Sequence, residues 1–236
     1  MAIKAVLFDL DGTLLPMDTD LFLKTYFGLL AKKMAANGYD AALFTKALFT
    51  GTDAMIANDG TAFNETVFWR EFSKFYAEGT VPPIALFDEF YEKDFPATRA
   101  VCGTDDRPRA IVDAVKEKGL LCALATAPGF PAVATETRMG YVGLSPEDFL
   151  FYTTYENSTY FKPNEKYYRE VAAKIGCEPS ECLMVGNDVT DDMIPAAAIG
   201  MRTFLLTEYL INKIGADISE YENGGYDELL SYIKAL

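Results

Sequence analysis

The sequence predicts an α/β fold, with a doubly wound, mostly parallel, Rossmann-like sheet and an α-helical bundle inserted near its beginning. Short apolar runs of strand length alternate with amphipathic segments at the start of the chain and again from residue 107 onward. Between them, residues 17–96 contain helical patterns in succession and no strand pattern. The first apolar run ends in acidic residues and a glycine, at the kind of strand end where open α/β sheets bind their ligands.

Five apolar runs are expected to form the sheet. The first, residues 3–8, is rich in β-formers and suits a strand that is buried on both faces. The other expected strands are residues 120–125, 149–153, 182–185 and 203–206. The flanking helices are expected at residues 109–118, 131–139, 164–175, a short segment ending at Ile199, and 226–236. Pro195 would break or kink the short helix unless it lies in the first turn.

The inserted segment is expected to contain four helices. Asp18 or Thr19 would cap the first helix, and Gly38 would end it. The other three are expected at residues 40–56, residues 63–76, and from the Pro82-Pro83 pair to about residue 91. We therefore predict two units, a core of residues 1–16 and 97–236 and a helical unit of residues 17–96. Most aromatic side chains of the insert are expected to form its own core, and those most able to face a substrate are Lys24, Lys46, Trp69 and Arg70.

Composition restricts the class of protein. The 236 residues are half hydrophobic, enough for a full core, yet no run approaches the ~18 uninterrupted apolar residues of a membrane span. A net charge of −14 argues against a nucleic-acid surface and against binding to an anionic membrane. The four cysteines form no CxxC pair, and the first residues do not resemble a signal segment. We expect reduced thiols and a cytoplasmic protein.

Histidine is absent from the sequence, which excludes histidine-based acid–base catalysis and histidine metal ligands. Acid–base chemistry therefore falls most naturally to carboxylates. Asp9 and Asp11 would share one face if the first strand stays extended that far, and Gly12 permits a sharp exit from the sheet. Taken alone, this stretch is also compatible with an acidic turn after a strand.

The stretch DLDGT at residues 9–13 resembles the DxDGT motif of the haloacid dehalogenase-like superfamily, whose members are mostly phosphatases. The second motif of that family, a Ser or Thr at the end of the next strand, is matched by Thr126. The third, a lysine often followed by proline, is matched by Lys162-Pro163. Each of these two matches is weak by itself, because threonine at a strand end and lysine before a helix are common. The order of the matches makes the joint pattern specific.

The fourth motif, a pair of metal-binding acids after a strand and a glycine, is matched by GNDVTDD at residues 186–192. Asn187 stands where many members have the first acid. We therefore assign the metal role to Asp188 and a supporting role in the metal site to Asp192, while Asn187 or Asp191 could replace either of them. A capped helix N-terminus, where acids are favoured anyway, is the alternative interpretation.

The resemblance implies a hydrolase, specifically a Mg²⁺-dependent phosphatase acting on a small phosphorylated metabolite. Asp9 would attack phosphorus and form an aspartyl-phosphate, and Asp11 would protonate the leaving oxygen and later activate water. Thr126 and Lys162 would hold the transferred phosphoryl group. Mg²⁺ would bind Asp9, the backbone carbonyl of Asp11, and Asp188. Hard oxygen ligands, with no histidine or thiolate at hand, independently point to magnesium.

The resemblance also implies that the helical insert is a cap that selects the substrate, so the sequence leaves the natural substrate open. A phosphomutase would use the same residues. A dehalogenase that uses Asp9 on carbon would leave Asp11 and the later acids unexplained. A non-catalytic binding protein on this fold is the alternative from another class, and the presence of all the expected catalytic side chains disfavours it. The oligomeric state is open.

Overall fold

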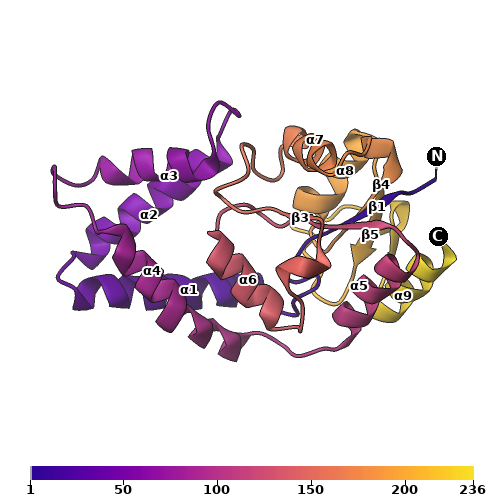
Figure 1. Cartoon of the computed structure of the whole chain (residues 1–236), viewed down its shortest axis with the longest axis horizontal. Helices are drawn as coiled ribbons and strands as arrows, with labels where there is room; N and C mark the ends of the chain where they lie inside the picture. Colours follow the sequence, from indigo (N-terminus) through magenta and orange to yellow (C-terminus); the bar gives the residue numbers. More distant parts are fainter. Residues whose placement is uncertain (1) are drawn as a thin grey trace.

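The computed structural model describes residues 2–236, which contain a six-stranded sheet with helices on both faces (Figure 1). The strands are β1 (Ala5–Phe8), β2 (Leu121–Leu124), β3 (Phe151–Tyr152), β4 (Cys182–Gly186), β5 (Arg202–Leu206) and β6 (Glu222–Gly224). Their order is β3-β2-β1-β4-β5-β6, and every neighbouring pair is parallel. The predicted doubly wound, parallel α/β core is confirmed.

Strand β6 was not predicted, so the expected number of strands was one too small. Its residues, Glu-Asn-Gly, have low strand propensity and carry no apolar pattern. They form a strand because they pair with β5, where Phe204 lies opposite Glu222. Strand β3 has two residues, shorter than the predicted segment of residues 149–153.

The central strand β1 is buried on both faces, as its apolar run predicted. Val6 and Phe8 belong to one hydrophobic cluster, whereas Ala5 and Leu7 belong to the other, because successive side chains point to opposite faces. The first cluster includes side chains of α5 (Arg107–Glu117) and α9 (Tyr226–Ala235), and the second includes side chains of α7 (Glu165–Lys174) and α8 (Ile194–Ala198). Figure 1 shows these two pairs of helices on opposite sides of the sheet.

The short helix predicted up to Ile199 consists of two parts. A π-helical turn, Val189–Met193, follows β4, and α8 continues from it. Pro195 lies in the first turn of α8, where a missing backbone N–H costs little. The other helical segments of the core are α6 (Ala132–Gly140) and short 3₁₀ turns at Phe95–Val101, Pro146–Asp148, Pro179–Glu181 and Ile218–Glu220.

The helical insert lies at one end of the molecule in Figure 1. Within the described residues it contains α1 (Thr19–Ala36), α2 (Ala41–Ile56), α3 (Asn64–Ser73) and α4 (Ile84–Lys93). Asp18 caps α1 by accepting a hydrogen bond from the backbone N–H of Leu21 at 2.9 Å. The connections into and out of the insert lie side by side, because Met17 and Cys102 form an antiparallel bridge.

No helix among residues 2–236 combines the length and the apolar character that crossing a membrane would require.

Candidate active site

The register of the sheet places the first, second and fourth motifs at one edge. Phe8, the last residue of β1, lies opposite Leu124 of β2 and Val185 of β4. Asp9, Thr126 and Asn187 follow those residues within two positions, so they meet at the carboxyl ends of three adjacent strands. This is the arrangement that the sequence predicted for the motif residues.

Asp9 is buried, with 6 % of the residue exposed, and both of its carboxylate oxygens have hydrogen-bond partners. The ammonium of Lys162 lies 2.8 Å from Asp9 Oδ1. The hydroxyl of Thr13 lies 3.2 Å from Asp9 Oδ2 and 3.1 Å from Asn187 Oδ1, so its single proton is shared between the two acceptors. These contacts fix the orientation of the Asp9 carboxylate.

Lys162 is buried between two carboxylates. Its Nζ atom lies 2.6 Å from Asp192 Oδ1 as well as close to Asp9. Burial opposes the charged form, but the neighbouring carboxylates of Asp192 and Asp9 outweigh it and raise the pKa of Lys162 well above its ordinary value. Lys162 therefore stays an ammonium group. The second oxygen of Asp192 accepts a hydrogen bond from the backbone N–H of Asp188 at 3.1 Å, so Asp192 links Lys162 to the loop after β4.

Thr126 is 1 % exposed, at the end of β2. Its backbone carbonyl accepts hydrogen bonds from the Tyr167 hydroxyl at 2.8 Å and from the Thr153 hydroxyl at 2.6 Å. Both donors lie in the core, so the loop that carries the Thr126 side chain is held in place.

The loop after β4 gives Asn187 and Asp188 different tasks. Asn187 is buried, and besides its contact with Thr13 it donates from Nδ2 to the backbone oxygen of Tyr209 at 2.7 Å. Oδ1 of Asp188 caps the following turn by accepting the N–H groups of Thr190 at 2.7 Å and Asp191 at 3.0 Å. Asn187 thus connects elements of the core, whereas Asp188 is partly exposed and lines a cavity.

Arg138 was not singled out by the sequence analysis, and it is fully buried. From α6 its guanidinium pairs with Oδ2 of Asp11 and lies 4.3 Å from the ring centre of Phe130. The other carboxylate oxygen of Asp11, Oδ1, is buried without a hydrogen-bond partner. Burial raises the pKa of Asp11, and the charge of Arg138 opposes that rise.

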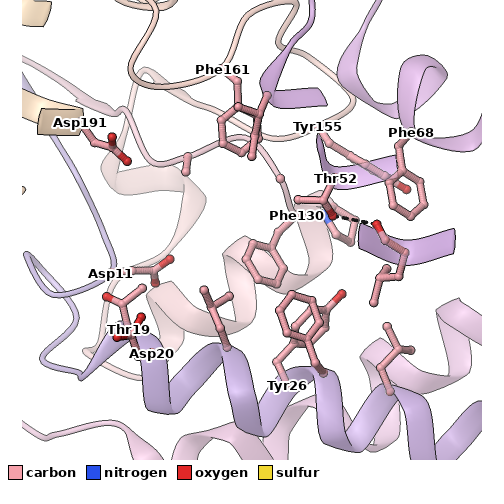
Figure 2. A pocket seen from close by; sticks show the side chains of 18 of the residues that line it. Asp11, Thr19, Asp20, Tyr26, Thr52, Phe68, Phe130, Tyr155, Phe161 and Asp191 are labelled. Atoms are coloured by element: carbon pink, nitrogen blue, oxygen red, sulfur yellow. Dashed lines mark hydrogen bonds between the residues drawn. The ribbon is translucent and has the colours of Figure 1, made fainter. Parts of the chain in front are cut away.

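A cavity of about 1050 Å³ opens between the helical insert and the core, next to Asp11. Figure 2 shows Asp11, Asp20 and Asp191 at one end and aromatic rings, among them Phe68 and Tyr155, at the other. The shape and lining are those of a site for a small organic ligand. The two ends of the cavity therefore differ in chemistry.

Of the four insert residues expected to face a substrate, Trp69 lines this cavity. Lys24, Lys46 and Arg70 are not among the residues that line it. Lys46 lies over an aromatic ring, and Arg70 pairs with the neighbouring Glu71.

The oxygen donors at this edge fit a hard cation in chemical type, since they are carboxylates, an amide and backbone carbonyls. Within residues 2–236, however, no three acidic, cysteine or histidine side chains are already gathered into a metal cluster. The ammonium of Lys162 instead bridges two of the acids, Asp9 and Asp192. A cation at this edge would be held by Asp9 together with Asp188 or Asp191, which are both partly exposed and line the cavity.

A sequence model of haloacid dehalogenase-like hydrolases matches residues 3–200 of the chain. The chain belongs to the haloacid dehalogenase-like hydrolase family. The resemblance inferred from the motifs is thereby confirmed, and the protein is a hydrolase of this family. Comparison with curated proteins gives no match.

Solved structures of this family share the fold over nearly the whole chain. A haloacid dehalogenase-like phosphatase from Thermococcus onnurineus is 18% identical, with a TM-score of 0.60 and 98% of each chain covered. A putative hydrolase from Bacillus subtilis bound to magnesium is 15% identical, with a TM-score of 0.56 and 99% of each chain covered. An L-2-haloacid dehalogenase is 15% identical, with a TM-score of 0.58 and 100% of each chain covered. Because the similar structures include both reaction types, the reaction has to be argued from the site.

Proposed function

We propose that this family member is a Mg²⁺-dependent phosphatase, a phosphoric monoester hydrolase that acts on a small phosphorylated metabolite through an aspartyl-phosphate. The observation that supports this best is the setting of Asp9. Its carboxylate is oriented by Lys162 and Thr13, and the second acid, Asp11, lines the adjoining cavity. A nucleophile and a separate acid–base group therefore lie two residues apart at one strand end.

In the first step an Asp9 oxygen forms a bond to phosphorus, and the bond from phosphorus to the leaving oxygen breaks. Asp11 gives its proton to that leaving oxygen. In the second step the oxygen of a water molecule bonds to phosphorus while Asp11 takes a proton from that water. The bond from phosphorus to the Asp9 oxygen breaks, which releases inorganic phosphate and restores the Asp9 carboxylate. Lys162 and the Thr126 hydroxyl hold the phosphoryl oxygens and offset their charge.

The residues that would hold Mg²⁺ are Asp9, the backbone carbonyl of Asp11, and Asp188, with Asp192 in a supporting role. The ion would offset the negative charge that builds up where these acids meet a phosphate. The magnesium-bound hydrolase from Bacillus subtilis supports this part of the proposal, as does the all-oxygen donor set.

A dehalogenase has less support from the site. Attack by Asp9 on carbon releases halide, which needs no proton, so the proton that Asp11 gives to a leaving oxygen would have no role. A phosphomutase uses the same residues and remains the closest alternative. We also propose that residues 17–96 act as a cap over a core of residues 1–16 and 97–236, since the cavity lies between them. A cytoplasmic location stays a prediction from composition.

The test is phosphate release from p-nitrophenyl phosphate by the whole chain, with Mg²⁺ and after treatment with EDTA. The proposal predicts turnover with Mg²⁺, its loss in EDTA, and none in Asp9→Asn under either condition. Chloride release from a 2-chloro acid in the same samples gives the comparison with a dehalogenase. Undiminished phosphate release in EDTA, or chloride release in place of phosphate release, would contradict the proposal.

A further inference from the structure

Within the part of the chain that the structure describes, no basic side chain lines the part of the cavity that lies away from Asp9 and Asp11. Among the described residues, Lys213 is the single basic side chain along the cavity wall, whereas acidic side chains occur at both ends. Lys213 comes two residues after Ile211, which forms a bridge with Asp188. It therefore lies at the end where Figure 2 shows Asp11 and Asp191. A carboxylate or a second phosphate on the leaving group would therefore meet no described basic side chain on the cavity wall at the aromatic end. This disfavours anionic leaving groups.

Glu65 and Glu156 reach the cavity from the insert and from the core, respectively. Glu65 lies in the first turn of α3, and its backbone N–H donates to the carbonyl of Tyr155 at 2.8 Å. The preceding Asn64 is fully buried and donates from Nδ2 to the carbonyl of Tyr160 at 3.2 Å. These contacts fasten the insert to the loop that carries Glu156. Burial raises the pKa of Glu65, and the negative charge of the nearby Glu156 raises it further.

The Glu156 carboxylate has only one of its two oxygens hydrogen-bonded. Oε1 of Glu156 accepts the backbone N–H of Ala132, at the start of α6, at 2.9 Å. Its other oxygen, Oε2, is buried and has no hydrogen-bond partner. Within residues 2–236 no lysine or arginine forms an ion pair with either Glu65 or Glu156. A buried acceptor without a donor is unfavourable, so a donor on a bound ligand would be stabilised here.

Aromatic rings surround the same part of the cavity. Trp69, Tyr91, Phe68 and Tyr155 line it, and Figure 2 labels the last two. Aromatic faces attract organic cations, and the apolar walls between them and Phe130 suit a hydrocarbon body. Acidic oxygens and aromatic faces together favour an ammonium group over a neutral polar group.

We propose that the substrate is a phosphate monoester of an apolar or aromatic alcohol that carries an ammonium group. Its phosphoryl group would lie at Asp9 and Asp11, its hydrocarbon body along the aromatic wall, and its ammonium group between Glu65 and Glu156. This inference rests on the proposed phosphatase function for the phosphate end. The recognition of the cation can be measured without catalysis.

Trp69 makes a direct binding experiment possible, because it is the one tryptophan of the sequence and lines the cavity. Its fluorescence is titrated with three probes of similar shape: para-methylbenzylamine, para-methylbenzyl alcohol and para-methylbenzoate. We expect the amine to bind at least about tenfold tighter than the neutral alcohol, and the benzoate weakest. Equal binding of the three probes, or a preference for the benzoate, would overturn the inference.

Two isosteric variants test the named acids. Glu65→Gln and Glu156→Gln should each reduce the preference for the amine, and the double variant should bring it to within about twofold of the neutral alcohol. The matched control is Glu92→Gln, on the exposed face of α4 and outside the cavity, which should leave the preference unchanged. Measuring both single variants keeps the test decisive if the double variant does not fold. A preference that survives both substitutions would overturn the assignment.

A kinetic comparison then connects the pocket to the reaction. The substrates are para-(aminomethyl)phenyl phosphate, para-methylphenyl phosphate and para-(carboxymethyl)phenyl phosphate. We expect kcat/KM to fall in that order, with at least about tenfold between the first and the last, and the double variant to flatten the series. If the amine binds selectively but none of the esters is hydrolysed, the pocket assignment holds and the phosphatase proposal fails. Hydrolysis of all three at equal rates would uphold the phosphatase and overturn this inference.

Discussion

Arg138 and Asp11 form an ion pair across 127 residues of sequence, and the arginine is 0 % exposed. The same guanidinium lies 4.3 Å from the ring centre of Phe130 and 5.8 Å from that of Phe22, in helix α1 of the insert. Arg138 therefore touches the proposed acid–base residue, the core loop and the insert at once. It holds the Asp11 carboxylate at the edge of the cavity.

Arg138→Met should destabilise the protein by about 3 kcal/mol, which is the low end of the range for removing one partner of a buried ion pair. The low end applies because the Asp11 side chain is still 18% exposed. Urea unfolding measures the change. The matched control is Arg169→Met on the exposed surface of α7, which should change the free energy of unfolding by less than about 0.5 kcal/mol. Equal losses in the two variants would show that the buried pair contributes nothing.

Two helical glycines should respond to alanine in opposite directions. A Cβ at Gly51, in α2, would lie 2.6 Å from Cδ2 of Phe68 and 3.2 Å from its backbone oxygen, so Gly51→Ala should cost about 1–3 kcal/mol. A Cβ at Gly28, in α1, would meet nothing within 4 Å. Gly28→Ala should therefore stabilise the protein by about 0.5–1 kcal/mol. Thermal unfolding of both variants checks this. Stabilisation by both would mean that α2 and α3 do not pack as closely as described.

Asp188→Ala should weaken Mg²⁺ binding by at least about tenfold, because it removes a charged oxygen donor. Asn187→Ala should instead lower stability, since the Asn187 side chain bonds Thr13 and the carbonyl of Tyr209. Isothermal titration with Mg²⁺ and thermal unfolding of both variants separate the two effects. A larger loss of Mg²⁺ affinity in Asn187→Ala would mean that Asn187, and not Asp188, is the metal-binding residue of the fourth motif.

The sequence predicted most of the fold because its helices and strands carry their own patterns. The run of residues 3–8, the capped helix after Asp18 and the proline in the first turn of α8 are local features. Strand β6 was missed because Glu222, Asn223 and Gly224 pair with β5 without any strand propensity of their own. Its formation depends on a neighbour that is distant in sequence.

In the candidate site, too, the sequence predicted what depends on local patterns and missed what depends on contacts between distant residues. The register of β1, β2 and β4 brings together residues that each followed a predicted strand, so the sequence could place them at one edge. Arg138 carried one usable signal, since it lies on the buried face of α6 with Ala134 and Met139, where a charge needs a partner. Its partner, Asp11, could not be read from spacing. The contact of Asn64 with the loop near Tyr160 left no signal in the sequence.

Replacing Asp9 or Asp11 by asparagine should leave different parts of the reaction intact. Asp9→Asn lacks the nucleophile and should be inactive on every substrate. Asp11→Asn lacks the proton donor, which a nitrophenolate leaving group hardly needs and an alkoxide does need. Asp11→Asn should therefore transfer phosphoryl from p-nitrophenyl phosphate and then stall, and it should fail on an alkyl phosphate.

The most direct test of the central claim is acid-quenched mass spectrometry of Asp11→Asn mixed with p-nitrophenyl phosphate and Mg²⁺. The account predicts a burst of nitrophenolate of about one equivalent per enzyme, with one phosphoryl group on the peptide that contains Asp9. Asp9→Asn, treated in the same way, should show neither. Steady, burst-free hydrolysis by Asp11→Asn with no phosphoryl group on Asp9 would contradict the aspartyl-phosphate mechanism.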